Sequence, residues 1–523
     1  MTTESDPVPA ADPQEQSAGR AAAPPPGCPA HAGGAGGPAR MHGTEAASNP
    51  YGLYEKLRAE HGAVAPVLVH GDLPAWLVLG YRELLDVTRN PTRFSRDSRN
   101  WRFLRDGQVG PDNPLLPLVT WVPMCSFVDG SEHRRLRSAV TDSMKRFDRH
   151  GIRRHVTRFS GQLVDEFAAT GRADLVGQFA EHLPMLVMTK ALGMAESYGP
   201  QLVEAARDMV KGSETAIASN DYIVQTLRDL VARKQAAPGH DFASWLVAHE
   251  SGLRDDELVE HLRLVLIAAY STTANLIANT LRMVLTDSRF RGNLAGGHMT
   301  LPDALEQVLW DEPPFTAVYG RYATGDTELA GQQIKAGDLL ILSLAAGNLD
   351  PEIRPDLDVP VHGNRSHLAF SGGPHECPGQ DIGRAIADTG IDTLLSRLPD
   401  LSLAVEEKEL KHRTSLLSRE LVELPVTFTP PGPATGAVRR EQAPAASVPG
   451  PSAPAAGAPA PAAQEPVPAA VPSATATAQR PVAQAAAPGP ETHPDGLSAG
   501  AGTESGRRRR PSLWRTLVAW WRG

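Results

Sequence analysis

A ten-residue stretch near residue 375 restricts the fold of this chain more than any other feature. It reads Phe-Ser-Gly-Gly-Pro-His-Glu-Cys-Pro-Gly from Phe370 to Gly379, so Cys377 lies in a glycine-rich loop. Apolar and small residues follow at helical spacing from Ile382 to Leu395. A thiolate at Cys377 would therefore lie at a helix N-terminus, where free N–H groups favour negative charge. The glycines also let backbone amides approach the sulfur, as a thiolate that binds a metal requires.

Composition divides the chain into a middle part that can fold and two terminal parts of different composition from it. Residues 1–45 and 433–505 are rich in Ala, Pro and Gly, so we expect both to be disordered. Residues 46–432 contain no internal linker and are expected to form one domain, followed by a basic, Trp-rich segment at 506–523. Three cysteines, no secretory signal and no apolar run of ~20 residues favour a cytoplasmic protein. The net charge of −9 argues against general nucleic-acid binding.

The folded middle has mainly helical periodicity with small sheets. Helical spacing dominates from 131 to 288, and the segment 256–286 is apolar on all sides at its centre. This pattern predicts a long helix buried through the middle of the domain. We also expect helices at 49–62 and 81–89, a hairpin of strands 64–69 and 75–79, and short strands at 317–345 and 401–429.

The Cys377 loop has the pattern Phe-x-x-Gly-x-His-x-Cys-x-Gly, which resembles the haem-ligand loop of the cytochrome P450 family. Ser371 stands where that family usually has glycine. The resemblance implies a mainly α fold with small β-sheets, with haem b (iron protoporphyrin IX) between the long helix and this loop. Cys377 would be the axial ligand of the haem iron, and Phe370, Gly379 and Ala268 would contact the haem. The alternative, a buried structural cysteine, is disfavoured because all five defined positions of the pattern match.

A second stretch, Asp-Gly-Ser-Glu-His-Arg-Arg-Leu-Arg from Asp129 to Arg137, looks like the family's Asp-x-x-Glu-His-x-x-x-Arg helix. The resemblance implies that His133 and Arg137, which share a helical face, bind a haem propionate. Arg321 matches the family's strand arginine that binds a propionate, and His375 is implied as a further donor. Buried propionates need cationic partners, and arginine is the better bidentate donor. An exposed, solvated helix face is the alternative for His133 and Arg137.

The long helix departs from the family pattern at Ala-Ala-Tyr-Ser-Thr-Thr, residues 268–273. The family usually has Ala-Gly-x-Asp/Glu-Thr-Thr here, and the acid and first threonine relay protons during oxygen activation. Thr272 is kept, whereas Ser271 replaces the acid and Ala269 replaces the glycine. Serine carries no charge near neutral pH, so we expect slower or water-dependent proton delivery through Ser271 and Thr272. The alternative for Thr272 is a hydroxyl that only bonds back to an i−4 carbonyl.

A further departure concerns the family's Glu-x-x-Arg helix, which joins an arginine of a later loop in a buried ion network. Gln307 takes the Glu position and Trp310 the Arg position. Glu306 lies about 100° round the helix and is not expected to substitute. We therefore expect the network to be lost and a hydrogen-bonded packing of Gln307 and Trp310 in its place. A small actinomycete subset of P450-like proteins has a similar Glu-Gln-x-x-Trp segment, and some are encoded beside sensor-kinase-like and small-GTPase-like proteins.

No Gly-x-Gly-x-x-Gly fingerprint for flavin or NAD occurs, so electrons are expected from a ferredoxin and its reductase. The resemblance places residues 133–155 on the face near Cys377, where an acidic ferredoxin would dock. Eight basic residues there outnumber Asp142 and Asp148, although a solvated basic face is the alternative. They are Arg134, Arg135, Arg137, Lys145, Arg146, Arg149, Arg153 and Arg154.

The C-terminal segment 507–523 begins with a run of four arginines and places Leu513, Trp514, Leu517, Val518 and Trp521 on one helical face. This predicts an anchor at the inner surface of the membrane, with a disordered tail or a groove-binding peptide as alternatives. The sequence thus favours a haem-thiolate monooxygenase that inserts one oxygen atom into a hydrophobic small molecule. The alternative is a catalytically weakened haem-binding partner in a membrane-associated signalling complex, because of Ser271, Gln307 and Trp310.

Overall fold

The computed structural model describes residues 37–211, 214–287, 300–361, 363–415 and 417–430. The predicted linker 433–505 and the C-terminal segment 506–523 lie outside the described residues, as does most of segment 1–45. The end of that N-terminal segment does not fit the expectation of disorder. Strand β1 (Ala39–Arg40) pairs in parallel with β2 (Val64–Val69), so the folded region begins before residue 46.

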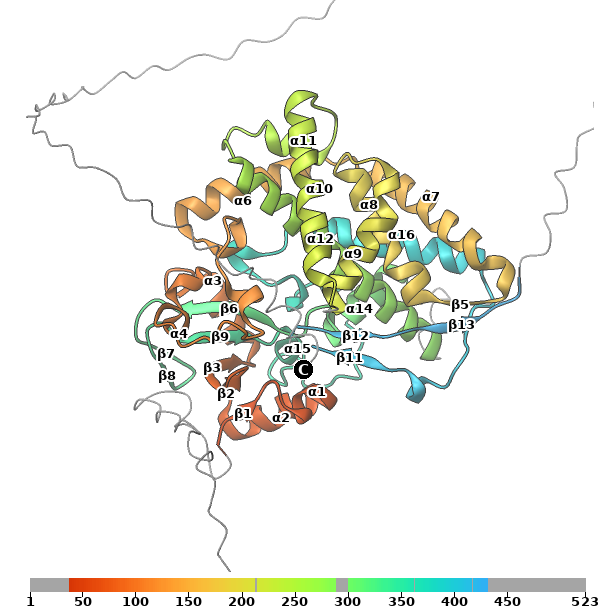
Figure 1. Ribbon diagram of the computed structural model, residues 1–523. Helices are drawn as coiled ribbons and strands as arrows, with labels where there is room; N and C mark the ends of the chain where they lie inside the picture. The colour runs from red at the N-terminus through yellow and green to blue at the C-terminus, as the bar shows by residue number, and fades with distance from the viewer. Residues whose placement is uncertain (1–36, 212–213, 288–299, 362, 416, 431–523) are drawn as a thin grey trace, which may run out of the picture. The chain divides into compact units, whose positions relative to one another are not determined.

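A six-stranded mixed sheet forms one side of the described domain (Figure 1), in the order β1-β2-β3-β9-β6-β4. β2 and β3 form the predicted hairpin, although β3 starts two residues earlier than expected. Gly71 and Asp72 have φ values of +82° and +52°, which turn the chain so that Val69 pairs with Leu73. The other strands of the sheet are β3 (Leu73–Val78), β4 (Phe94–Ser95), β6 (Val318–Ala323) and β9 (Leu339–Leu342).

Helices form the larger part of the domain (Figure 1), which confirms the predicted mainly α class. Three of them border the site, α6 (Gly130–Lys145), α12 (Asp255–Thr286) and α16 (Gln380–Arg397). The remaining helices are α1 (Thr44–Ser48), α2 (Pro50–His61), α3 (Tyr81–Arg89), α4 (Arg102–Arg105), α5 (Leu116–Val119), α7 (Arg149–Phe167), α8 (His182–Ala191), α9 (Gly199–Lys211), α10 (Ala216–Ala236), α11 (Phe242–Val247), α14 (Leu301–Asp311) and α15 (Leu344–Asn348).

The predicted long helix is confirmed as α12, which packs against α8, α10, α14 and α16. It is buried nearly all round because apolar residues occupy every face of its centre. By length and composition α12 is the one described helix that could cross a membrane, but 67% of its apolar window is buried inside the fold. Burial of that kind is what a core helix shows.

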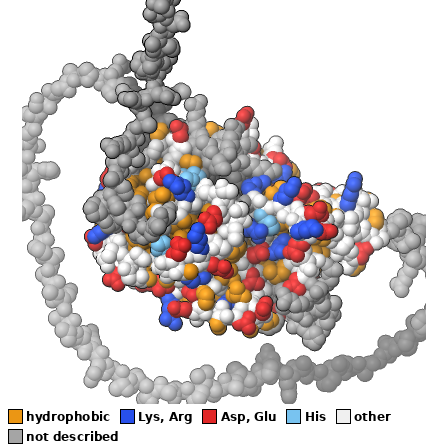
Figure 2. Space-filling view, turned by 90° about the horizontal axis from the view of Figure 1, so that it is seen from below, with side chains coloured by type: hydrophobic (Ala, Val, Ile, Leu, Met, Phe, Trp, Pro, Cys, Tyr) orange, Lys and Arg blue, Asp and Glu red, His pale blue; other side chains and the backbone are white. Residues whose placement is uncertain are grey.

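Small strand pairs lie beside the helices. β5 (Arg172–Asp174) and β10 (Ser402–Leu403) flank β13 (Pro425–Thr427) in a three-stranded sheet. The other two pairs are β7 (Thr327–Leu329) with β8 (Gln332–Ile334), and β11 (His412–Thr414) with β12 (Arg419–Leu421). The surface in Figure 2 intersperses acidic, basic and apolar side chains, so this face shows no broad patch of one charge.

Candidate active site

An apolar cavity of about 290 Å³ lies between α12 and the Cys377 loop. Its walls bring together most of the residues that the sequence singled out, although these come from distant parts of the chain. They are Arg137, Ala268, Thr272, Arg321, Phe370, His375, Cys377 and Gly379. The His133 ring packs against that of His375 at the cavity edge, with ring centroids 4.1 Å apart and the planes tilted by 44°. Ser271 does not line this cavity.

The loop holds Cys377 through its own backbone. The Cys377 N–H donates to the Phe370 carbonyl at 2.9 Å, and the Gly379 N–H faces the sulfur. Burial raises the pKa of the Cys377 thiol, and the Gly379 N–H partly opposes that rise. Gly373 has φ +68°, and a Cβ there would lie 2.3 Å from the Thr88 carbonyl oxygen. Because burial disfavours the charged form of Cys377, a thiolate there needs a cation in the cavity beside it.

Buried cations gather at one end of the cavity. Arg321 is only 3% exposed, and its Nε and Nη1 atoms have no hydrogen-bond partner among the described residues. Burial lowers the pKa of Arg321 well below its usual value, and the nearby Arg96 lowers it further. The buried Nε2 of His133 likewise has no partner in the described protein. A group with carboxylates at this end would satisfy these donors, so the residues present fit the two propionates of haem.

Arg96 is a cavity residue that the sequence reasoning missed. Its guanidinium donates to the carbonyls of Ser126 at 3.0 Å, Tyr319 at 2.6 Å and Gly320 at 2.9 Å. Those bonds fix a second, partly buried cation beside Arg321. A single arginine after a short strand carries no recognisable spacing, so no signal in the sequence could have identified it.

His375 has a protein partner that the sequence did not reveal. Its Nε2 lies 3.0 Å from Asp129 Oδ1, and Asp129 also accepts from Ser95 Oγ at 2.6 Å. Burial would raise the pKa of Asp129, but these hydrogen bonds hold it at about 2. Arg137 in turn donates to the Glu376 carbonyl, which ties α6 to the Cys377 loop. The Asp129 motif therefore positions the loop as well as the expected propionate donors.

The two hydroxyls of the predicted proton relay lie on different sides of α12. Thr272 lines the apolar cavity, and its Oγ1 donates back to the Ala268 carbonyl at 2.6 Å. Ser271 instead lines a separate polar pocket of about 320 Å³ together with Asn275 and Glu420. The structure thus shows both features considered for Thr272, the back-bonded hydroxyl and the place on the cavity wall.

The expectation that the ion network below the haem loop is lost is wrong. Glu306 is 3% exposed and binds Arg384 through two hydrogen bonds of 2.6 and 3.2 Å. His367 Nε2 donates to the same carboxylate at 3.0 Å. The Arg384 guanidinium lies 4.5 Å from the centroid of the Phe370 ring, so this cluster supports the Cys377 loop from below. The acidic residue of the network is shifted by one position along α14, and its arginine partner comes from α16 because Trp310 occupies the arginine position of α14.

The expected hydrogen-bonded packing of Gln307 and Trp310 is confirmed. Gln307 donates to Asp311 at 2.7 Å and accepts from the Val361 N–H at 3.2 Å. Trp310 Nε1 donates to the Asn364 carbonyl at 2.8 Å. A second buried ion pair lies alongside, because Arg354 Nη1 is 2.8 Å from Asp311 Oδ1. Neutral and ionic contacts therefore share this side of α14.

Comparison with known proteins agrees with this geometry, although no family model matches the sequence. The chain is similar to a cytochrome P450 of Priestia megaterium, with 30% identity over 72% of this chain and 95% of that protein. It is also 30% identical to the vitamin D(3) 25-hydroxylase of Pseudonocardia autotrophica, over 73% of this chain and 94% of the relative. The solved structure of CYP154A1 from Streptomyces coelicolor A3(2) aligns with a TM-score of 0.65 and 29% identity, over 73% and 98% of the two chains. This chain belongs to the cytochrome P450 family, as a monooxygenase with haem as its cofactor.

Proposed function

We propose that this monooxygenase inserts one oxygen atom into a hydrophobic small molecule, using electrons from a ferredoxin and its reductase. The observation that carries the proposal is the apolar wall of the cavity above the Cys377 loop. Most of the wall consists of aliphatic and aromatic side chains, which favour an apolar substrate. They include Val140, Met144, Met188, Leu264, Val265, Leu276, Phe315, Val318 and Leu342. A relative named for vitamin D(3), a largely hydrocarbon compound, supports the same substrate class.

Each part of the site would have a distinct task. Bound haem would supply oxygen activation, and Cys377 would hold the iron as a thiolate. Arg321, His133 and Arg137 would bind the propionates and so fix the ring in the cavity. Ala268, having only a methyl group, leaves room on the α12 side for substrate and oxygen. The Thr272 hydroxyl would turn its hydrogen from the Ala268 carbonyl toward that space and so deliver a proton there.

Proton supply to Thr272 would begin in the polar pocket behind α12. Glu420 there accepts from Ser418 Oγ at 2.9 Å and from Asn275 Nδ2 at 3.3 Å, and Ser271 lies on the same wall. Ser271 and Thr272 are adjacent in sequence but their side chains lie on different sides of α12, so the proton would have to pass between them through water. A serine in place of an acid would make this transfer depend on water in the pocket.

The ferredoxin would dock on the side of the Cys377 loop, where a surface cleft of about 540 Å³ lies between α6, α7, α14 and α16. Its charge is more balanced than the sequence suggested. Arg149 pairs with Asp381 at 2.8 Å, and Arg153 pairs with Asp388 at 3.2 Å. Acidic residues of α16 therefore offset part of the basic excess of segment 133–155. We expect electrostatic steering of the partner to be modest and readily weakened by salt.

The decisive experiment is a reduced–carbon monoxide spectrum of the purified protein with ferredoxin, ferredoxin reductase and NADPH. A red-shifted thiolate band that disappears in Cys377→Ser supports the proposal and justifies screening apolar substrates by difference spectroscopy. A band that forms only with dithionite would overturn the ferredoxin part of the proposal for the donor pair used. No band with either reductant would overturn the thiolate site itself.

The alternative of a weakened haem-binding partner in a signalling complex loses one of its supports, because Glu306 provides the ion network that seemed absent. Its other supports are Ser271 in place of the family's acid and the segment 507–523, which lies outside the described residues. A cytoplasmic enzyme with weak contact to the inner membrane surface stays a proposal from sequence. Deleting 507–523 should move the full-length protein out of the membrane fraction, and unchanged partitioning would refute the anchor.

A further inference from the structure

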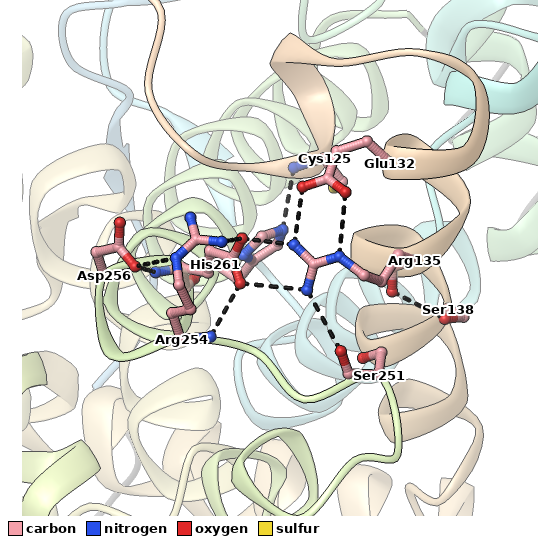
Figure 3. A network of polar contacts seen from close by, with 9 residues as sticks. Cys125, Glu132, Arg135, Ser138, Ser251, Arg254, Asp256 and His261 are labelled. Atoms are coloured by element: carbon pink, nitrogen blue, oxygen red, sulfur yellow. Dashed lines mark hydrogen bonds and ion pairs between the residues drawn. The ribbon is translucent and has the colours of Figure 1, made fainter. Parts of the chain in front are cut away.

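An ion cluster built around one fully buried carboxylate joins the start of α12 to α6 (Figure 3). The Glu257 carboxylate is 0% exposed and lies between two arginines, with Arg135 Nη2 at 2.5 Å and Arg254 Nη1 at 2.7 Å. Arg135 comes from α6 and also binds Glu132 at 2.8 Å. A buried carboxylate with two guanidinium partners has its charge well compensated, so the first turn of α12 is held firmly.

One turn further along α12, the side chain of His261 joins this cluster to the wall of the active site (Figure 3). His261 is 0% exposed, and its Nε2 accepts from the backbone N–H of Cys125 at 3.0 Å. Its Nδ1 lies 2.6 Å from the Glu257 carbonyl. A carbonyl only accepts, so Nδ1 must carry the proton and Nε2 must be bare. Both ring nitrogens are therefore used, and only the neutral imidazole satisfies both contacts.

The residue that His261 holds belongs to residues 121–128, which we call the wall segment. Cys125 and Ser126 of this segment line the apolar cavity. Two backbone hydrogen bonds lie within this segment, from Met124 N–H to the Val122 carbonyl at 2.8 Å and from Phe127 N–H to the Met124 carbonyl at 3.0 Å. Both join residues of the same turn. The bond from the Cys125 amide to His261 links the wall segment to the long helix across 136 residues of sequence.

We propose that His261 is a positioning residue of the active site, which fixes the wall segment against α12 when neutral and releases it when protonated. Protonation would place a hydrogen on Nε2, opposite the Cys125 N–H, so an acceptor would become a second donor. Cys125 would then lose its fixed place on the cavity wall, whereas Ser126 keeps its bond to Arg96. Because Cys125 lines the same cavity as the expected propionate donors Arg137 and Arg321, its release would loosen the site that the substrate must fill.

The charged groups around His261 come from both packed helices. Burial lowers the pKa of His261 below 6.5, whereas Glu257 and Glu260 on its own helix oppose that change, and Arg135 of α6 adds to it. The imidazole is accordingly neutral near pH 7 in the folded protein. The bond to Cys125 should be fully formed above about pH 6.5 and should weaken as the pH falls below that value.

Hydrogen–deuterium exchange of the haem-loaded, full-length protein tests the proposal at the Cys125 amide. The protection factor of the peptide that covers the wall segment should fall at least ~10-fold between pH 7 and pH 5, relative to a reference peptide in α16. His261→Gln keeps an acceptor that does not titrate, so its protection should be independent of pH over this range. Wild-type protection that follows the same pH profile as His261→Gln would overturn the proposal.

Two further variants separate positioning from general destabilisation. His261→Phe, which offers no acceptor, should expose the wall segment at every pH while the α16 peptide stays protected, and Cys125 should react faster with a maleimide at pH 7. Unchanged protection and labelling in this variant would also overturn the proposal. If His261→Phe does not fold, the comparison of wild type with His261→Gln still decides. His182→Gln, at another histidine whose pKa burial lowers, should leave the wall segment unchanged.

Discussion

Ser371 shows why glycine is expected at the second position of the Cys377 loop. Its backbone has φ +60° and ψ −157°, a conformation that is essentially reserved for glycine. The loop needs this bend because the Cys377 N–H must return to the Phe370 carbonyl. The sequence identified the unusual residue, and the structure supplies the backbone reason for it.

Ser371→Gly should therefore stabilise the protein by about 1 kcal/mol, since relief of backbone strain exceeds the entropy cost of an added glycine. Urea unfolding of the haem-loaded protein measures the change. Ser366→Gly is the matched control on the approach to the same loop. Ser366 is not among the described positive-φ residues, so this substitution should be slightly destabilising. A loss of stability in Ser371→Gly would show that the side chain matters more than the bend.

Thr272 is the hydroxyl on the cavity wall whose loss should affect chemistry most. Thr272→Ala should lower the product formed per NADPH by about 10-fold or more, because proton delivery typically contributes at least that much. Thr272→Ser should retain most of the coupling. Thr280→Ala removes an equivalent back-bonded hydroxyl, 2.7 Å from the Leu276 carbonyl but away from the cavity, and should leave coupling unchanged. Equal yields from Thr272→Ala and wild type would remove Thr272 from the mechanism.

At the scale of the helix, α14 uses two neighbouring faces for two kinds of support. Glu306 faces α16 and the haem loop, where burial opposes ionisation but hydrogen bonds from His367 and Arg384 hold its pKa at about 2. Gln307 and Trp310 face the loop that contains Val361 and Asn364. Residues 306 and 307 point about 100° apart around the helix axis, so α14 has an ionic face beside a neutral one.

Glu306→Gln should cost about 3 kcal/mol of unfolding free energy, because it leaves Arg384 buried without its counter-charge. It should also speed the loss of haem, since Arg384 packs on Phe370 beneath the loop. Urea unfolding and transfer of haem to apomyoglobin measure the two effects. Glu352→Gln, in an exposed pair with Arg82 at 3.6 Å, should change neither. Normal stability of Glu306→Gln would mean that the cluster is not a brace.

The sequence predicted elements and motifs better than it predicted contacts between them. Apolar periodicity identified α12, and the spacing around Cys377 identified the loop, because both signals are local. The partners of Glu306 could not be read in this way, since Arg384 and His367 lie 78 and 61 residues away. The same holds for Asp129 with His375. Charge pairing across the fold depends on which helix faces meet, and a single sequence does not specify that.

At the scale of the whole molecule, histidines buried as neutral groups should make stability depend on pH. Burial lowers the pKa of His70 and of His412 from 6.5 to about 4, helped by His42 and Arg419 respectively. The unfolded chain therefore binds protons before the folded protein does. Stability should be complete above about pH 6.5 and should decline as the pH falls toward 4.

Thermal unfolding midpoints measured between pH 7.5 and 4.5 would show this decline. His70→Gln should make the midpoint depend less steeply on pH, because it removes one group whose pKa is lower in the folded protein than in the unfolded chain. Below about pH 4.5 a further loss should begin as Glu306, whose folded pKa is about 2, becomes protonated in the unfolded chain first. Midpoints that stay level from pH 7.5 to 5 would contradict the assignment of buried neutral histidines.

The buried guanidinium of Arg321 has a consequence for how much of this protein a cell can keep. The described protein provides no hydrogen-bonding carboxylate for its Nε and Nη1, although Asp129 lies near enough to offset part of the charge, so a haem propionate would complete the balance. Haem then adds its binding free energy to the folded state by mass action. Protein abundance should therefore follow the haem supply of the host, with newly made chains degraded faster when haem synthesis is limiting.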